Sequence, residues 1–224
     1  MGSIIRTAAN NVGASGVFSS SAFNNASLNS ITSLPTAVDG KMKLILSTTA
    51  SGNSTRSFTS GIDSTYRTYY FKFVNIHPAT DGARFQFQGS TQGASSTDGD
   101  YANNITSTFV NTYHRENDEA SPTYVYRNNL HSSQSSSYCN LNQNTDNDND
   151  SNLSGEMWLF NPSSTTYVKH WMARFVTPSN YSPPYMDYDW TAGYFNTTSA
   201  INAIRFKFSS GNIDAGTISL YGIA

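Results

Sequence analysis

The sequence predicts an all-β fold, an antiparallel β-sandwich of jelly-roll type preceded by an N-terminal arm. Ser, Thr and Asn together fill more than a third of the 224 positions, and these side chains compete with the backbone hydrogen bonds of helices. The chain also holds 14 Tyr and 13 Phe, which strands favour. About ten short segments alternate apolar and polar residues, with turn residues between them, which is typical of sandwiches.

The strongest strand signal is "YRTYYFKFVNI" at residues 66–76. One face would carry Tyr66, Thr68, Tyr70, Lys72, Val74 and Ile76, and the other Arg67, Tyr69, Phe71, Phe73 and Asn75. Aromatic residues on both faces favour a central strand. The next segment also alternates, with Phe85 and Phe87 expected inside and Arg84, Gln86 and Gln88 expected outside.

Further strands are expected towards both ends of this domain. Residues 41–49 would place Met42, Leu44 and Leu46 on one face. The chain ends on a predicted hairpin, residues 203–208 and 217–223, which would build the C-terminus into a sheet. The remaining predicted strands lie at residues 123–128, 155–162, 165–176 and 188–196.

The domain organisation is predicted as an arm or anchor at residues 1–38 and a sandwich at residues 39–224. Two interpretations of the arm stay open. Phe23, Ala26, Ile31 and Leu34 fall near helical spacing, and Pro35 would end such a helix. Alternatively, the segment is extended and is ordered only against another subunit.

Composition argues against several classes of partner. The net charge is −2 and only 12% of residues are charged, so no nucleic-acid partner is expected. No apolar run is long enough for a membrane span, and no leader peptide is expected. Cys139 is the one cysteine, so neither an intrachain disulfide nor a cysteine zinc cluster is expected. The protein is expected to mature in a reducing cytoplasm.

Two long segments, residues 89–107 and 132–154, are expected to be loops that project from the ends of the sandwich. The second contains Asp146, Asp148 and Asp150, which resemble the start of a calcium loop. Such a loop needs Gly at its sixth position and Glu at its twelfth, where this chain has Ser151 and Met157. A solvated acidic loop is therefore predicted. The alternative is that these three aspartates, with Asp98 and Asp100 of the first segment, hold a cation or bond sugar hydroxyls.

No catalytic, cofactor-binding or metal-binding residue is predicted. The histidines His77, His114, His131 and His170 lack zinc-ligand spacing, and His77 is expected to shape a turn by bonding backbone. Carboxylates that could supply a catalytic pair are Asp63, Asp81, Asp187, Asp189, Glu116 and Glu119. Nothing in the sequence singles out two of them, and no Gly-X-Ser-X-Gly nucleophile motif occurs.

The segment "YSPPYMDYDWTAGYFN" gathers Tyr181, Tyr185, Tyr188, Trp190 and Tyr194. Aromatic rings near Asp and Asn are the elements of a sugar-binding surface. The competing interpretation is that half of these rings face the core and the others fill a subunit interface.

Four segments together resemble a family of tailed-phage virion proteins, common in cyanophages: "GVFSSSAFNNASLNSITSLPTAV", "FTSGIDSTYRTYYFKFVNIHPATDGARFQFQ", "GEMWLFNPSSTTYVKHWMARF" and "AIRFKFSSGNIDAGTISLYGI". The resemblance implies a non-enzymatic structural protein of the virion, a capsid decoration protein or tail subunit made in the host bacterial cytoplasm. Its arm would bind neighbouring virion proteins, and a homotrimer is expected. The alternative is a receptor-binding adhesin that recognises host surface glycans through its loops.

Overall fold

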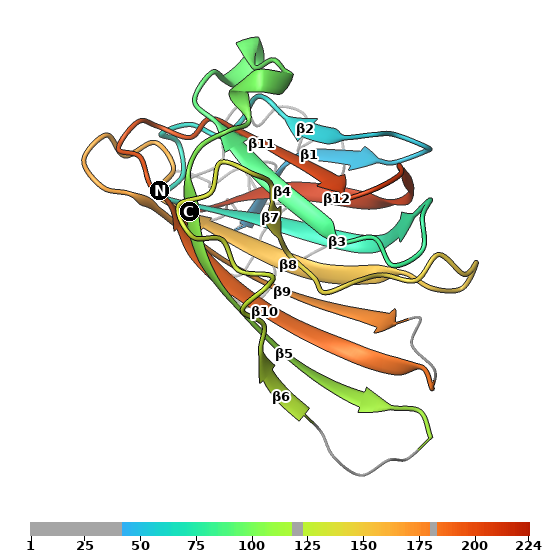
Figure 1. Cartoon of the computed structure of the whole chain (residues 1–224). Coiled ribbons are helices and arrows are strands. Elements are labelled where there is room, and N and C mark those ends of the chain that lie inside the picture. The colour runs from blue at the N-terminus through green and yellow to red at the C-terminus, as the bar shows by residue number, and fades with distance from the viewer. Residues whose placement is uncertain (1–41, 118–122, 180–182) are drawn as a thin grey trace, which may run out of the picture. The chain divides into compact units, whose positions relative to one another are not determined.

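A computed structural model describes residues 42–117, 123–179 and 183–224. Contacts divide the chain into Met1–Gly40 and Lys41–Ala224, and the second unit is described here. It consists of two antiparallel sheets packed face to face (Figure 1), which confirms the predicted β-sandwich. The jelly-roll subtype stays a prediction, and the arm at residues 1–38 lies outside the described residues.

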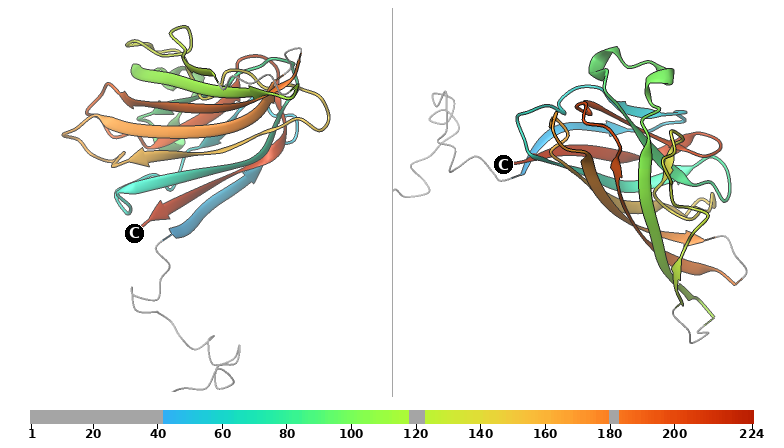
Figure 2. Two further views of the ribbon diagram at one scale, coloured as in Figure 1. Left: turned by 90° about the horizontal axis from the view of Figure 1, so that it is seen from below. Right: turned by 60° about the vertical axis from the view of Figure 1, so that its left-hand side comes forward.

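The larger sheet has eight strands in the order β1-β12-β3-β8-β9-β10-β5-β6. Their bounds are β1 Met42–Thr49, β3 Thr68–Pro78, β5 Ile105–Arg115, β6 Thr123–Tyr126, β8 Leu153–Phe160, β9 Lys169–Ser179, β10 Tyr185–Phe195 and β12 Ile213–Ile223. The last strand lies between β1 and β3, so the C-terminus is built into the sheet, as predicted. Figure 2 shows that these strands fan out with a strong twist.

The smaller sheet has four strands in the order β2-β11-β4-β7. Their bounds are β2 Arg56–Phe58, β4 Phe85–Ser90, β7 Cys139–Asn140 and β11 Ala203–Phe208. This sheet covers the inner face of the larger one and encloses a core rich in phenylalanine. At its centre Phe206 and Phe85 stack with ring centroids 5.8 Å apart, and Phe73 meets both rings edge-on.

The predicted alternation of faces along β3 is correct as far as Val74. Tyr69, Phe71 and Phe73 are buried, and Lys72 and Val74 are exposed. Asn75 then adopts a positive φ of 53°, and the register with β8 shifts between Phe73 and Ile76. This bulge turns Ile76 into the core, so its assignment to the face of Lys72 is wrong.

One further expectation fails at the level of side chains. Gln88 was expected to face outwards but is fully buried. Its amide nitrogen donates to the backbone oxygens of Asn103, Ser136 and Ser137, which compensates for its burial.

At the sheet edge, Met42 and Leu44 are about half exposed and Leu46 is 40% exposed. Ile45, on the other face of β1, packs against the core, so the three exposed residues lie on the outer face of the sheet.

The segment 132–154 does not project as a free loop. It contains β7, and Leu141, Asn142 and Thr145 within it are fully buried. Asn142 accepts a hydrogen bond from the backbone of Phe85 and donates to Thr145. Several of its polar residues are therefore internal hydrogen-bond partners, and the longest exposed run is residues 147–150.

Candidate functional site

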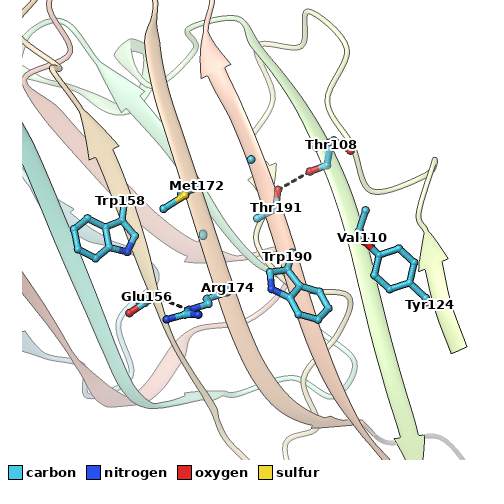
Figure 3. A pocket seen from close by; sticks show the side chains of 11 residues that line it. Thr108, Val110, Tyr124, Glu156, Trp158, Met172, Arg174, Trp190 and Thr191 are labelled. Carbon is cyan, nitrogen blue, oxygen red and sulfur yellow. Dashed lines mark hydrogen bonds and ion pairs between the residues drawn. The ribbon is translucent and has the colours of Figure 1, made fainter. Parts of the chain in front are cut away.

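The outer face of the eight-stranded sheet is hollowed into an open groove across β8, β9, β10, β5 and β6. Its volume is about 500 Å³. The residues that line it are Thr108, Val110, Tyr124, Glu156, Trp158, Met172, Ala173, Arg174, Trp190, Thr191 and Ala192 (Figure 3). We call this hollow the aromatic groove. It lies on paired strands, and a rigid scaffold of this kind holds side chains in fixed positions.

The alternation of β10 divides the aromatic residues that the sequence singles out. Tyr188, Trp190 and Tyr194 lie on the outer face and are partly exposed, whereas Tyr185 faces inwards and is 6% exposed. Tyr181 lies outside the described residues. One of the four described rings therefore faces the core, fewer than the half that was expected, and the role of the outward rings in a subunit interface stays a prediction.

One wall of the aromatic groove is built around Trp190. The ring of Tyr188 lies 3.9 Å from it between centroids, and Tyr124 approaches from the edge strand β6 at 6.4 Å. Tyr124 is 73% exposed, so its ring extends this wall into solvent. Such rings present flat apolar surfaces at little cost in conformational entropy.

The opposite wall comes from Trp158 on β8. Its ring lies 4.8 Å from that of Tyr70 on β3, and Tyr70 in turn lies 5.9 Å from Tyr221 on β12. No local pattern joins these residues to Trp190, because they come from strands far apart in the chain. They are site residues that sequence reasoning missed.

An ion pair lies between the two walls, as Figure 3 shows. The Nε of Arg174 donates to Oε1 of Glu156 at 2.6 Å, and the Tyr70 hydroxyl donates to the other carboxylate oxygen at 3.0 Å. Burial, and then the bond to Glu156, raise the pKa of Tyr70 to about 12. The carboxylate beside Arg174 raises the pKa of that guanidinium. The groove floor is therefore charged and fixed in geometry at neutral pH.

A second hollow of about 420 Å³ continues along the same face. It shares Glu156 and Arg174 with the aromatic groove and adds Lys72, Val74 and Tyr188 among its lining residues. The two hollows together form one extended trough, which suits an elongated ligand better than a compact one.

The inner face of β10 carries a different kind of polar group. Asp187 and Asp189 are fully buried, and the structure brings both into one hydrogen-bonded network. Asn111 donates to Asp187 at 3.0 Å, and the backbone N–H of Gln143 donates to Asp189 at 3.1 Å. Arg127 donates to the side-chain oxygen of Asn111 at 3.0 Å.

This network leaves two oxygens, Oδ2 of Asp187 and Oδ1 of Asp189, without a partner among the described atoms. Burial raises the pKa of Asp187 to about 7. It also raises the pKa of Asp189 well above the ordinary value, with the charge of Asp187 adding to the effect. A carboxyl pair of this kind holds a proton near neutral pH. Both side chains are fully buried, however, so a substrate could not reach them.

The remaining candidate carboxylates are dispersed. Asp63 accepts from the Thr65 backbone and the Tyr69 hydroxyl, which lowers the pKa of Asp63, chiefly through the Thr65 bonds. Asp81 lies between β3 and β4, and Glu116 directly follows β5, while Glu119 lies outside the described residues. Sequence reasoning could not single out Asp187 and Asp189 because Asn111, Gln143 and Arg127 come from three other segments.

The other polar candidates serve structural contacts. The Asp146 side chain accepts from the Asp148 backbone, and His77 contacts the backbone oxygen of Asp148 at 3.2 Å, which fits its expected bonding to backbone. Asp98 pairs with Arg205, and Asp100 forms a capping box with Thr97. Within the described ranges, no group of three or more His, Cys, Asp or Glu is placed to hold a metal ion.

The other histidines and the cysteine also lie apart from the aromatic groove. The His131 ring stacks near Tyr126, and His170 lies near Tyr194, whereas His114 is exposed on β5. Cys139 is buried, and burial raises the pKa of its thiol, which makes it a poor nucleophile at neutral pH.

Comparison with known proteins finds no matching family model, no similar curated protein and no similar solved structure. Among the residues that the structure describes, no helix has the length and apolar character needed to cross a membrane. The geometry of the trough is therefore the main basis for a functional conclusion.

Proposed function

We propose that this protein is a non-enzymatic component of a tailed-phage virion that binds a saccharide chain on the host surface through the aromatic groove. The virion context rests on the sequence resemblance. The observation that supports saccharide binding is the arrangement of Trp190 and Trp158 on opposite walls, with the Glu156–Arg174 pair between them. Indole rings stack on the apolar faces of sugars, and charged groups bond their hydroxyls.

The dimensions of the trough suit more than one sugar ring. Trp158 lies on β8 and Trp190 on β10, two strands apart, which separates their backbones by about 10 Å. A ligand that contacts both indoles must therefore span the ion pair. Each stacking or hydrogen-bonding contact contributes about 1 kcal/mol, so several copies on one particle would be needed for firm attachment.

The test is binding of the purified protein to immobilised oligosaccharides and to host cells. We expect the double variant Trp158→Ala/Trp190→Ala to lose binding by tenfold or more while staying folded. Tyr167→Ala is the matched control, because Tyr167 is an aromatic residue that is 70% exposed outside the groove. Equal binding by the double variant and the control would contradict the proposal.

A second candidate function, assembly with neighbouring subunits, has its own observation. The edge strand β1 exposes Met42, Leu44 and Leu46, and among the described residues no strand pairs with its outer edge, which makes that edge suited to pairing with another chain. The homotrimer implied by the resemblance is proposed to use this edge. Leu46→Lys is expected to lower the mass measured by light scattering from a trimer to a monomer. An unchanged mass would place the contact elsewhere.

A further inference from the structure

The charges that line the trough are not balanced. Among the described lining residues of the two hollows, three carry a full charge: Lys72, Arg174 and Glu156. Two cations and one anion leave the trough with a net charge of +1, whereas the whole chain carries −2. The trough is therefore a cationic region on an otherwise weakly anionic protein.

The one carboxylate of the trough is already occupied. Oε1 of Glu156 accepts from Arg174 and Oε2 accepts from the hydroxyl of Tyr70, and the Glu156 side chain is only 20% exposed. The Arg174 side chain engages Glu156 through Nε and also bonds to the Tyr188 side chain. It is nevertheless 57% exposed, so part of its surface remains open to a ligand. A ligand would therefore meet a hydrogen-bond donor with positive charge between the two indoles.

From this charge distribution we infer that the trough selects an acidic saccharide, one whose sugar rings carry carboxylates. This inference rests on the proposed saccharide-binding function and names its ligand class. A ring stacked on Trp190 or Trp158 would place its carboxylate beside Arg174, and a further acidic ring would reach Lys72, which is exposed on β3. Charge-assisted hydrogen bonds of this kind are about twice as strong as neutral ones, so they would separate acidic from neutral chains.

The experiment measures binding of trigalacturonic acid and of its methyl ester by isothermal titration calorimetry at pH 7 and low ionic strength. The two probes have the same rings and linkages and differ in charge. We expect the acid to bind about tenfold more tightly than the ester. The ratio should shrink towards one as salt is raised to about 0.5 M, because the contacts with Arg174 and Lys72 are exposed and are screened.

Two variants locate the charge preference. Glu156→Gln/Arg174→Gln removes both members of the ion pair without leaving either one alone, and Lys72→Gln removes the second cation. Each should reduce the affinity for the acid several-fold and leave that for the ester unchanged. Lys43→Gln is the matched control, because Lys43 is exposed on β1 and does not line either hollow.

The outcomes separate the two proposals. Equal affinities for acid and ester, lost together in Trp190→Ala, would overturn the acidic preference and leave saccharide binding intact. If the protein binds neither probe and none of the immobilised neutral and acidic oligosaccharides, the proposed function itself is contradicted. Equal competition by poly-glutamate would show a general anion surface and would overturn selection of a sugar.

Discussion

The two faces of β10 reverse the usual relation between polarity and exposure. Its inner face buries Asp187 and Asp189, while its outer face leaves Met186 48% exposed and carries Tyr188 and Trp190. A strand arranged for stability alone would place its apolar side chains inside and its charges outside. Departures from that pattern are expected at functional sites.

The reversal has a separate physical cause on each face. Inside, the carboxyl groups supply acceptors for Asn111 and for the backbone of Gln143, so they fasten the segment around Gln143 to the large sheet. Outside, no described segment covers the aromatic rings, and an exposed apolar surface of this kind marks an interaction site. The inner face therefore serves folding and the outer face is the one proposed to bind a ligand, so substitutions on each should have different effects.

The largest expected difference is between two neighbouring residues of β10. Phe195 is fully buried and packs against Phe87 at 5.8 Å between ring centroids, so Phe195→Ala should cost about 3–5 kcal/mol in the free energy of unfolding. Tyr194 lies on the outer face, and Tyr194→Ala should cost less than about 1 kcal/mol. Chemical denaturation measures both. Similar losses for the two variants would break the comparison.

The buried carboxyl pair should make stability depend on pH. Burial raises the pKa of Asp187 to about 7 and that of Asp189 well above its ordinary value, so the folded state holds protons that the unfolded state releases. This contribution is complete below the ordinary pKa near 4 and is lost as pH rises through 7. Unfolding free energy should therefore fall by about 2 kcal/mol or more between pH 5 and pH 8.

The isosteric variant Asp187→Asn/Asp189→Asn tests the origin of that slope. It keeps the shape of the network and removes its titrating groups, so its stability should be nearly flat over the same range. Asp214→Asn is a control carboxylate substitution, because Asp214 is exposed on β12. A pH profile of the double variant parallel to that of the wild type would assign the slope to other groups.

The smallest expected effect on stability is that of Trp190→Ala. The ring lies in the open groove and contacts Tyr188 and Tyr124 rather than the core, so the unfolding free energy should change by less than about 1 kcal/mol. Binding to the acidic probe should nevertheless be lost. A loss of several kcal/mol would show that the ring is structural and would weaken its assignment to the site.

The sequence predicted the fold where side-chain alternation was strong. Phe85 and Phe87 are buried as expected, and both C-terminal strands form. The predicted hairpin between them is wrong, because β11 pairs with β2 and β4 in the smaller sheet while β12 pairs with β1 and β3 in the larger one. Strand β5, next to the edge strand β6, escaped prediction because Ser, Thr and Asn dominate it, so its apolar period is weak. The buried Gln88 and Asn142 were assigned to the surface, since residue type alone does not reveal that backbone groups of distant segments satisfy their amides.

The candidate site was predicted only in part. Tyr188 and Trp190 stood out because they lie in one aromatic stretch of the sequence. Trp158, Tyr70 and Arg174 join them only through the pairing of β3, β8, β9 and β10, which no local pattern specifies. The bulge at Asn75 shows the same limit, because a single residue with positive φ changed which face Ile76 occupies.

The most direct test of the central claim is a nuclear magnetic resonance titration of the indole N–H signals with trigalacturonic acid. The chain has three tryptophans, of which Trp158 and Trp190 line the groove, while Trp171 is 1% exposed and lies on the inner face beside Phe87. Saccharide binding on the outer face predicts saturable shifts of the Trp158 and Trp190 signals and a nearly unchanged Trp171 signal. Saturable binding that leaves Trp158 and Trp190 unchanged would contradict it.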